Sequence, residues 1–208
     1  MDKGIWVTGL GTATGQRDEC VLTVGAEVRR PSAAAALSAS AEALERMRAA
    51  LLAGGVEESA LATSAVSLNP MYDDYPTVAG FQAAVHLTAT TTDLAAVGAL
   101  LRDVVVAGGD DARLQGVSFG HRDTSALLVS ARAAAWADAA TRAGQLAGLA
   151  GRELGDVLAI DETVSSARPP GPMVRATAMS DPGGPARMSM DAGEGSVVVS
   201  LTVGWSLR

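Results

Sequence analysis

An alanine-rich segment at residues 116–151 restricts the possible folds of this chain more than any other part of it. The segment begins with a short strand-like run, breaks at Gly120 and His121, and continues as a long helical stretch that ends in glycine. Aromatic residues make up only 3% of the chain, so alanine, valine and leucine must supply the core. Because small side chains let a helix approach its neighbour closely, we expect alanine-faced helices packed tightly on β-sheets.

Alternation of apolar and polar residues predicts strands along much of the chain. The pattern is clearest at residues 19–30 and 196–206. A polar stretch at residues 15–18 follows the first predicted strand, and it predicts that the first two strands form a hairpin. The remaining strands are expected at residues 5–14, 65–75, 78–91 and 114–119, and within residues 155–166.

Capping residues and apolar positions at helical spacing predict three helices. Pro31 and Ser32 open the first helix, and Thr92 is the expected N-cap of the second. Either Asp123 or Thr124 caps the third, which runs to Gly151. Glycines follow the end of each helix, as is typical of helix C-termini.

The predicted order of elements is ββα-ββα-βα-ββ. This order indicates an α+β fold with mainly antiparallel sheets and three helices packed on one face. The 208 residues fit a single domain, residues 1–208, or two interleaved α+β subdomains. Residues 167–195 are rich in proline, glycine and methionine without any period, and they are expected to form a mobile loop.

Composition excludes several classes of function. The net charge of −7 and the scattered arginines give no basic face for nucleic acid, so no nucleic-acid partner is expected. Cys20 is the only cysteine, lies in a strand pattern, and is expected to be a small buried apolar residue. No apolar run approaches the roughly 18 residues of a membrane span, so no transmembrane segment is expected.

The first residues contain no pattern typical of a signal peptide. The chain as given is therefore expected to be cytoplasmic. The alternative is a periplasmic or secreted protein, if the chain is a trimmed mature form.

Four weak motifs, taken in chain order, carry a family resemblance. They are the opening strand at residues 5–11, the stretch LNPMY at 68–72, VAGFQA at 78–83, and the segment at 116–119 followed by 131–134 and 138–139. In this order they resemble the SIMPL family, a bacterial group of unknown function, over nearly the whole chain. The resemblance implies an envelope-associated protein that assembles into homo-oligomers and contributes to stress tolerance, with no established catalytic residues.

Two short motifs mimic known active sites. Residues 9–15 copy the glycine spacing of a dinucleotide-binding loop, but they lead into a strand rather than a helix, so no cofactor is expected. His121 lies at the start of the third helix, where it could act as a general base with Asp123 orienting it. The alternative is that Asp123 caps the helix and His121 is an exposed loop residue.

Four methionines gather in the predicted loop: Met173, Met179, Met188 and Met190. Thioethers are soft ligands suited to Cu(I), but the irregular spacing favours contacts with a neighbouring subunit or plain disorder. The two histidines lie far apart and have no cysteine companion, so no zinc site is expected.

The sequence thus predicts a non-enzymatic protein that acts through homo-oligomeric assembly and binding of a protein partner. Two alternatives remain open at this point. One is a stress protein that binds a small molecule or soft metal through the methionines. The other is a hydrolase that uses His121 and Asp123.

Overall fold

The computed structural model describes residues 4–73, 75–165 and 190–208. The described residues form seven strands and three helices in the predicted order, which confirms the α+β class. Most of the predicted loop at 167–195 lies outside them. The elements are β1 (Gly4–Gln16), β2 (Glu19–Arg30), α1 (Ala33–Ala53), β3 (Leu61–Tyr72), β4 (Val78–Thr91), α2 (Val97–Gly108), β5 (Ala112–Gly120), α3 (Ser125–Leu149), β6 (Leu154–Ser165) and β7 (Glu194–Leu207).

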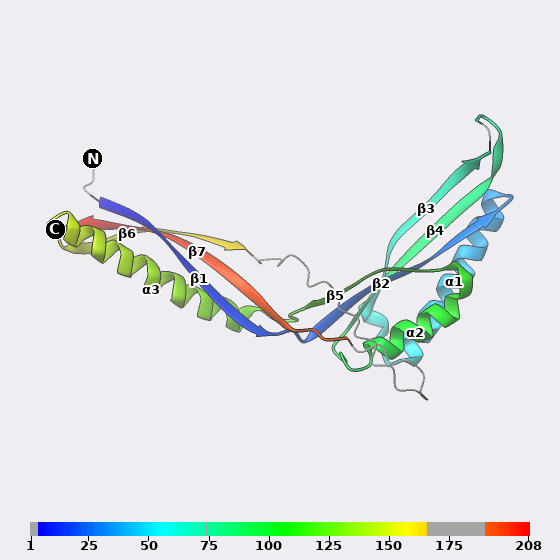
Figure 1. Cartoon of the computed structure of the whole chain (residues 1–208), viewed down its shortest axis with the longest axis horizontal. Coiled ribbons are helices and arrows are strands. Elements are labelled where there is room, and N and C mark those ends of the chain that lie inside the picture. Colours follow the sequence, from blue (N-terminus) through cyan, green and yellow to red (C-terminus); the bar gives the residue numbers. More distant parts are fainter. Residues whose placement is uncertain (1–3, 74, 166–189) are drawn as a thin grey trace, which may run out of the picture. The chain divides into compact units, whose positions relative to one another are not determined.

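The chain divides into two compact units, here called unit 1 and unit 2. Unit 1 contains residues 1–17, 121–173 and 193–208, and unit 2 contains residues 18–120 and 174–192. Each unit has its own antiparallel sheet and its own helices (Figure 1). The three predicted helices are therefore shared between two sheets, and within each unit the helices pack on one face of the sheet.

Unit 1 is a three-stranded sheet in the order β1-β7-β6, with α3 packed along it. The helix presents a stripe of alanines at every fourth position, all of them buried. These alanines are Ala131, Ala135, Ala139, Ala143 and Ala147. They pack in one cluster with the alternate buried residues of β7, from Val199 to Trp205. The expected close packing of an alanine-faced helix on a sheet is confirmed.

Gly9 and Gly11 of β1 make this close approach possible. A β-carbon on Gly11 would lie 2.0 Å from the carbonyl oxygen of Ala131, and one on Gly9 would lie 2.2 Å from that of Ala135. Such distances are far below van der Waals contact, so only glycine fits at either position. Gly9 and Gly11, which belong to the stretch that mimics a nucleotide-binding loop, thus form the surface on which α3 packs.

Unit 2 is a four-stranded sheet in the order β3-β4-β2-β5, and α1 and α2 cover one of its faces. The core is built from larger side chains than in unit 1, including Leu22 and Val24 of β2, Met47 and Leu51 of α1, and Val104 of α2. Cys20 is fully buried in this core, as expected. Burial, followed by the nearby charge of Glu19, raises the pKa of its thiol to about 11.

The predicted hairpin between the first two strands is wrong. β1 pairs with β7, from Gly4 opposite Ser206 to Gln16 opposite Glu194, whereas β2 pairs with β4 and β5. The two strands match different cores. β1 offers glycines to an alanine helix, and β2 offers leucine and valine to the larger core of unit 2.

The helix starts were predicted with mixed success. The Ser32 hydroxyl accepts a hydrogen bond from the Ala35 amide at 3.3 Å, which confirms Ser32 as the N-cap of α1. The prediction that Thr92 is the N-cap of α2 was wrong, because this helix begins at Val97. The side chain that organises the preceding turn is Asp93, whose carboxylate accepts from the Ala96 amide at 3.1 Å.

Candidate functional site

His121 lies over the end of the β1–β7 ladder in unit 1. Its half-buried ring packs against Gly15 and Gly195, which are paired with each other in that ladder. A β-carbon on Gly195 would lie 2.5 Å from the imidazole Nε2 atom. Among the residues that the structure describes, this buried Nε2 atom has no hydrogen-bond partner. His121 is therefore a packed side chain rather than the exposed loop residue considered from the sequence.

Thr124 occupies the N-cap position of α3 but its side chain makes no capping bond, and the exposed Asp123 before it supplies that bond instead. Its carboxylate accepts a hydrogen bond from the Ser125 amide at 2.8 Å. Hydrogen bonds from Ser125 lower the pKa of this carboxyl below its usual value, which keeps the cap ionised. Among the described residues, no hydrogen bond joins Asp123 to His121, and the general-base hypothesis stays a prediction.

The methionine cluster is only partly visible. Met173, Met179 and Met188 lie outside the described residues. Met190 is half-buried and packs against the core of unit 2, so its thioether serves there as an apolar contact. In the described ranges, no group of three or more His, Cys, Asp or Glu side chains is placed to hold a metal ion.

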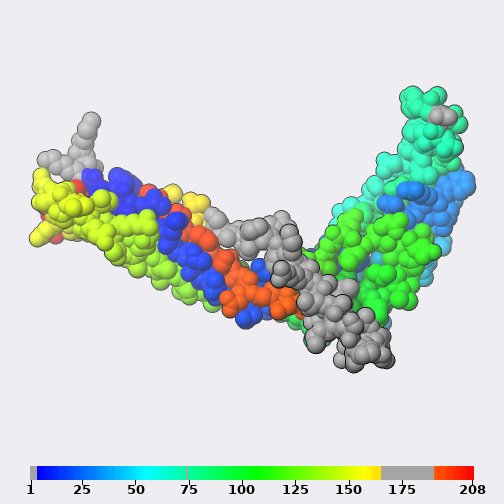
Figure 2. Space-filling model, in the orientation of Figure 1, coloured from blue at the N-terminus to red at the C-terminus, as the bar shows by residue number. Residues whose placement is uncertain are grey.

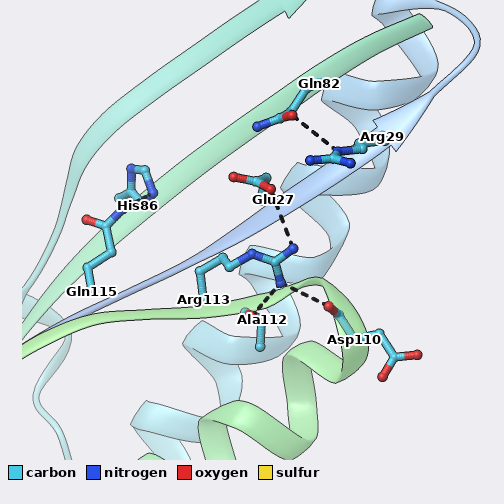
Figure 3. A network of polar contacts seen from close by, with 8 residues as sticks. All are labelled: Glu27, Arg29, Gln82, His86, Asp110, Ala112, Arg113 and Gln115. Atoms are coloured by element: carbon cyan, nitrogen blue, oxygen red, sulfur yellow. Dashed lines mark hydrogen bonds and ion pairs between the residues drawn. The ribbon is translucent and has the colours of Figure 1, made fainter. Parts of the chain in front are cut away.

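The sheet of unit 2 carries a polar network on the face opposite its helices (Figure 3). Arg113 of β5 is its centre: the guanidinium donates to the backbone oxygens of Asp110 at 3.0 Å and Ala112 at 2.8 Å. The same group lies 3.5 Å from the carboxylate of Glu27 on β2. These contacts hold the end of β5 to the neighbouring strand and leave an ordered, charged surface.

Two further pairs extend this polar face. Arg29 donates to the side-chain oxygen of Gln82 at 3.2 Å, which links β2 to β4. Farther along β4, the Nε2 atom of His86 contacts the side-chain amide of Gln115 on β5 (Figure 3). Gly25 of β2 is the ladder partner of His86, and a β-carbon there would come within 2.5 Å of the His86 ring. The glycine thus lets the imidazole cross β2.

Four of the six side chains in this network were placed correctly from the sequence. The alternation placed Glu27, Arg29, Gln82 and His86 on the polar side of their strands, where the structure has them. Arg113 and Gln115 were missed, because the register of β5 shifts opposite Thr23 and Val24 and interrupts the alternation. The network combines cations, a carboxylate, amides and an imidazole, and such groups can bind a partner through charges and hydrogen bonds.

Large apolar side chains are exposed on the outer strands of both sheets. In unit 1 they are Trp6 and Leu10 of β1 and Ile160 and Val164 of β6. In unit 2 the outer strand β3 exposes Val66 and Leu68, and it has no buried residue along its length. The end of the β3–β4 hairpin stands clear of α1 and α2 in Figure 2. No helix in the described part of the chain is long and apolar enough to cross a membrane.

The fold and these surfaces define an antiparallel α+β protein whose sheets carry helices on one face and leave their outer strands uncovered. The chain belongs to the SIMPL family, described as "Protein of unknown function (DUF541)", whose model matches residues 5–205. This confirms the resemblance drawn from the four motifs.

Two curated relatives are similar over most of their length. The chain is 33% identical over 180 residues to the "26 kDa periplasmic immunogenic protein" of Brucella melitensis, and the matched region covers 81% of this chain and 69% of the relative. The same identity and coverage hold for the protein of that name from Brucella abortus.

Similarity to solved structures is slight. A protein from Galdieria sulphuraria, described as unknown, matches 94% of this chain and 83% of its own with a TM-score of 0.23 and 8% identity. The structure "AtUAH in complex with glyoxylate" matches 54% of this chain and 27% of its own, with a TM-score of 0.25 and 11% identity. Scores this low carry no argument about fold or activity.

Proposed function

We propose that this protein acts without catalysis, by assembling into homo-oligomers and binding partner proteins in the periplasm. The observation that carries the proposal is the exposure of large apolar side chains along outer strands. Val66 of β3 is 60% exposed and Ile160 of β6 is 57% exposed, each on a strand at the edge of its sheet. Uncovered apolar edge strands are typical of surfaces that pair with another chain.

The polar face of unit 2 supports the partner-binding half of the proposal. Arg113, Glu27 and Arg29 are held in place by contacts within the unit, so a partner would meet a charged surface that is already ordered. Ordered charges favour recognition, because little conformational entropy is lost when a partner binds. Arg29 is exposed, whereas Glu27 is half-buried.

The periplasmic location rests on the names of the two relatives, each called a periplasmic protein. They favour the periplasmic alternative over the cytoplasmic expectation drawn from the first residues. Fractionation of cells that express the natural gene tests it. The protein should leave the cells with a periplasmic marker after osmotic shock, and retention with a cytoplasmic marker would contradict the location.

Assembly is tested by light scattering coupled to size-exclusion chromatography, with the full chain at concentrations from 1 to about 100 µM. The expected result is a mass above that of a single chain, rising with concentration. A mass of one chain across the whole range would contradict the proposal. A role in stress tolerance, which the family resemblance implies, predicts lower peroxide survival in a deletion strain than in the same strain with the gene restored.

A further inference from the structure

Four strands end the two sheets: β1 and β6 in unit 1, and β3 and β5 in unit 2. Each presents a row of backbone groups to which another strand could add. The four differ in what already occupies that row and in the charges they carry. This difference decides which edge a second copy of the chain, bearing the same charges, can pair with.

The outer edge of β1 is occupied by side chains of α3. The carboxylate of Asp138 accepts a hydrogen bond from the Leu10 amide at 2.9 Å, and Arg142 donates to the Thr8 carbonyl at 3.3 Å. Asp138 and Arg142 are themselves joined by an ion pair of 2.9 Å. The pair takes the backbone groups that an added strand would need, so the edge is blocked in its middle.

The edges of β6 and β5 carry charges that oppose pairing with a second copy. β6 contains Asp156, Asp161 and Glu162, and although Arg208 and Arg132 pair with Asp156 and Glu162, two β6 strands side by side would still gather charged side chains along the ladder. Its ladder also shifts register twice near Val157. β5 contains Arg113 and shifts register near its middle. Like charges placed opposite each other across a ladder are destabilising.

β3 has neither an occupied edge nor a charged one, and its own two register shifts lie outside the continuous run from Ala65 to Pro70. Its 12 residues include no charged side chain, although the chain carries a net charge of −7. In the described part of the chain it pairs with β4 alone. Val66 and Leu68 lie opposite the buried Val85 and Ala83 of β4, so they share the face that the helices cover farther inward. They are nevertheless 60% and 41% exposed, which leaves apolar area for a partner to bury.

The backbone of β3 fixes which residues can bond outward. Pro70 has no N–H, so its nitrogen must point away from β4. Register is continuous from Ala65 to Pro70, so Val66 and Leu68 have the same orientation and their amides and carbonyls point outward. At the N-terminal end of this continuous run, Ser64 is the extra residue at a register shift. Ser64 and Pro70 are equally distant from Ser67.

We propose that β3 pairs antiparallel with β3 of a second copy, about a two-fold axis at Ser67. Val66 of each copy then lies opposite Leu68 of the other copy, which gives two symmetry-related pairs. Each pair exchanges two backbone hydrogen bonds. The irregular Ser64 lies opposite Pro70, so the missing N–H falls where the ladder is already interrupted. The two four-stranded sheets become one of eight strands. This assignment rests on the proposed assembly and names its surface and partner.

The contact is small by the standard of stable interfaces. A single strand pair with two apolar side chains from each copy buries less than the roughly 1,200 Å² of a typical specific interface. The pairing is therefore expected to depend on concentration, unless other contacts in the assembly support it. The two Ser67 side chains meet on the polar face in a non-hydrogen-bonded pair, where Cα atoms lie about 4.5 Å apart.

A disulfide at this position tests the axis directly. Two cysteines about 4.4–6.8 Å apart between Cα atoms can form a bridge, so Ser67→Cys is expected to yield mostly disulfide-linked dimer under mild oxidation. The native Cys20 is buried and does not compete. Thr163→Cys on the exposed β6 is the matched control and is expected to stay mostly monomeric on a non-reducing gel.

A second variant tests the same surface without a cross-link. Val66→Lys places a charge on β3 at an exposed site, so the fold should be unaffected while the mass in light scattering falls. Val106→Lys on α2, where the side chain is 75% exposed and belongs to no edge strand, is the control and should leave the mass unchanged. The pairing is overturned if wild type is oligomeric but Ser67→Cys fails to link, or if Ile160→Lys dissociates the oligomer while Val66→Lys does not. A wild type that is a single chain at all concentrations overturns the proposed assembly as well.

Discussion

In unit 1 a helix rests on its sheet through alanine against glycine, whereas in unit 2 two helices rest on theirs through leucine, valine and methionine. The first contact brings backbones together, so it leaves no room for an added atom. The second is filled by side chains, so it depends on their volume. Enlarging a residue at the helix–sheet contact should therefore destabilise unit 1 more than unit 2. Truncating a buried side chain should destabilise unit 2 more than unit 1.

The chain offers a separate reporter for each unit. All three tryptophans, Trp6, Trp136 and Trp205, lie in unit 1, and the only cysteine lies in unit 2. The rings of Trp136 and Trp205 are 6.0 Å apart between centroids, and they connect α3 to β7. Tryptophan fluorescence therefore follows the packing of unit 1, and thiol labelling follows the opening of unit 2.

The largest effect is expected from Gly11→Val. The new β-carbon would meet the Ala131 carbonyl oxygen at 2.0 Å and the Ala135 nitrogen at 2.3 Å, so the helix must move away from β1. Unit 1 should lose more than the roughly 1–3 kcal/mol typical of overpacked cores, because the atoms in the way are backbone. Urea unfolding followed by tryptophan fluorescence measures this loss.

Gly116→Ala in β5 is the matched control for that substitution. A β-carbon at Gly116 has no atom within 4 Å. The tryptophan transition should therefore keep the midpoint of the wild type. An unchanged midpoint for Gly11→Val as well would break the contrast between the two cores.

Truncation of unit 2 should have the next largest effect. Leu51→Ala removes a fully buried side chain from α1 and should cost about 2–5 kcal/mol. Cys20 reports the loss, since its buried thiol, with a pKa raised to about 11, reacts only when unit 2 opens. Labelling near neutral pH should be faster in the variant, while the tryptophan transition stays in place.

The neighbouring Leu52→Ala serves as the control, because Leu52 is 39% exposed and its truncation leaves no cavity. Its labelling rate should stay close to that of the wild type. If Leu51→Ala shifted the tryptophan transition as far as the labelling, the two units would unfold together. The comparison of separate cores would then fail.

The smallest effect is expected from Asp123→Ala, which removes the carboxylate that caps α3. The folded state lowers the pKa of this group, so its contribution is present above the unfolded value of 3.8. It is lost as the pH falls through the folded value. Thermal melts should show the variant slightly less stable than the wild type near neutral pH, with the two converging in acid.

Asp123→Asn separates the hydrogen bond from the charge. An asparagine at the same place can still accept from the Ser125 amide, so most of the stability should remain while the pH dependence disappears. A difference between wild type and Asp123→Ala that persisted unchanged in acid would show that the cap does not depend on ionisation.

Sequence patterns located the strands of unit 2 well, and for a physical reason. The bounds of β2 and β4 were predicted to the residue, because each has one buried face and so alternates strictly. The pairing of β1 with β7 was missed. Nothing near Gly9 indicates that its surface belongs to a helix more than a hundred residues away.

The functional surfaces were harder to predict than the fold. Asp123 was named as a cap from its position, since capping is local. The recess that Gly15 and Gly195 form around His121 was not predicted, because those glycines come together only through the β1–β7 ladder. The exposure of β3 was likewise not predicted from the sequence, since its composition resembles that of any half-buried strand.

The pairing of the first strand with the last sets an order on synthesis. β1 is complete at Gln16, but its partner β7 begins only at Glu194. At about 5–20 residues per second, β1 waits about 10–40 s for that partner. All four strands of the unit 2 sheet leave the ribosome within this interval. β1 is therefore made long before it is built into its sheet, and throughout the delay it is an unpaired strand without a single charge.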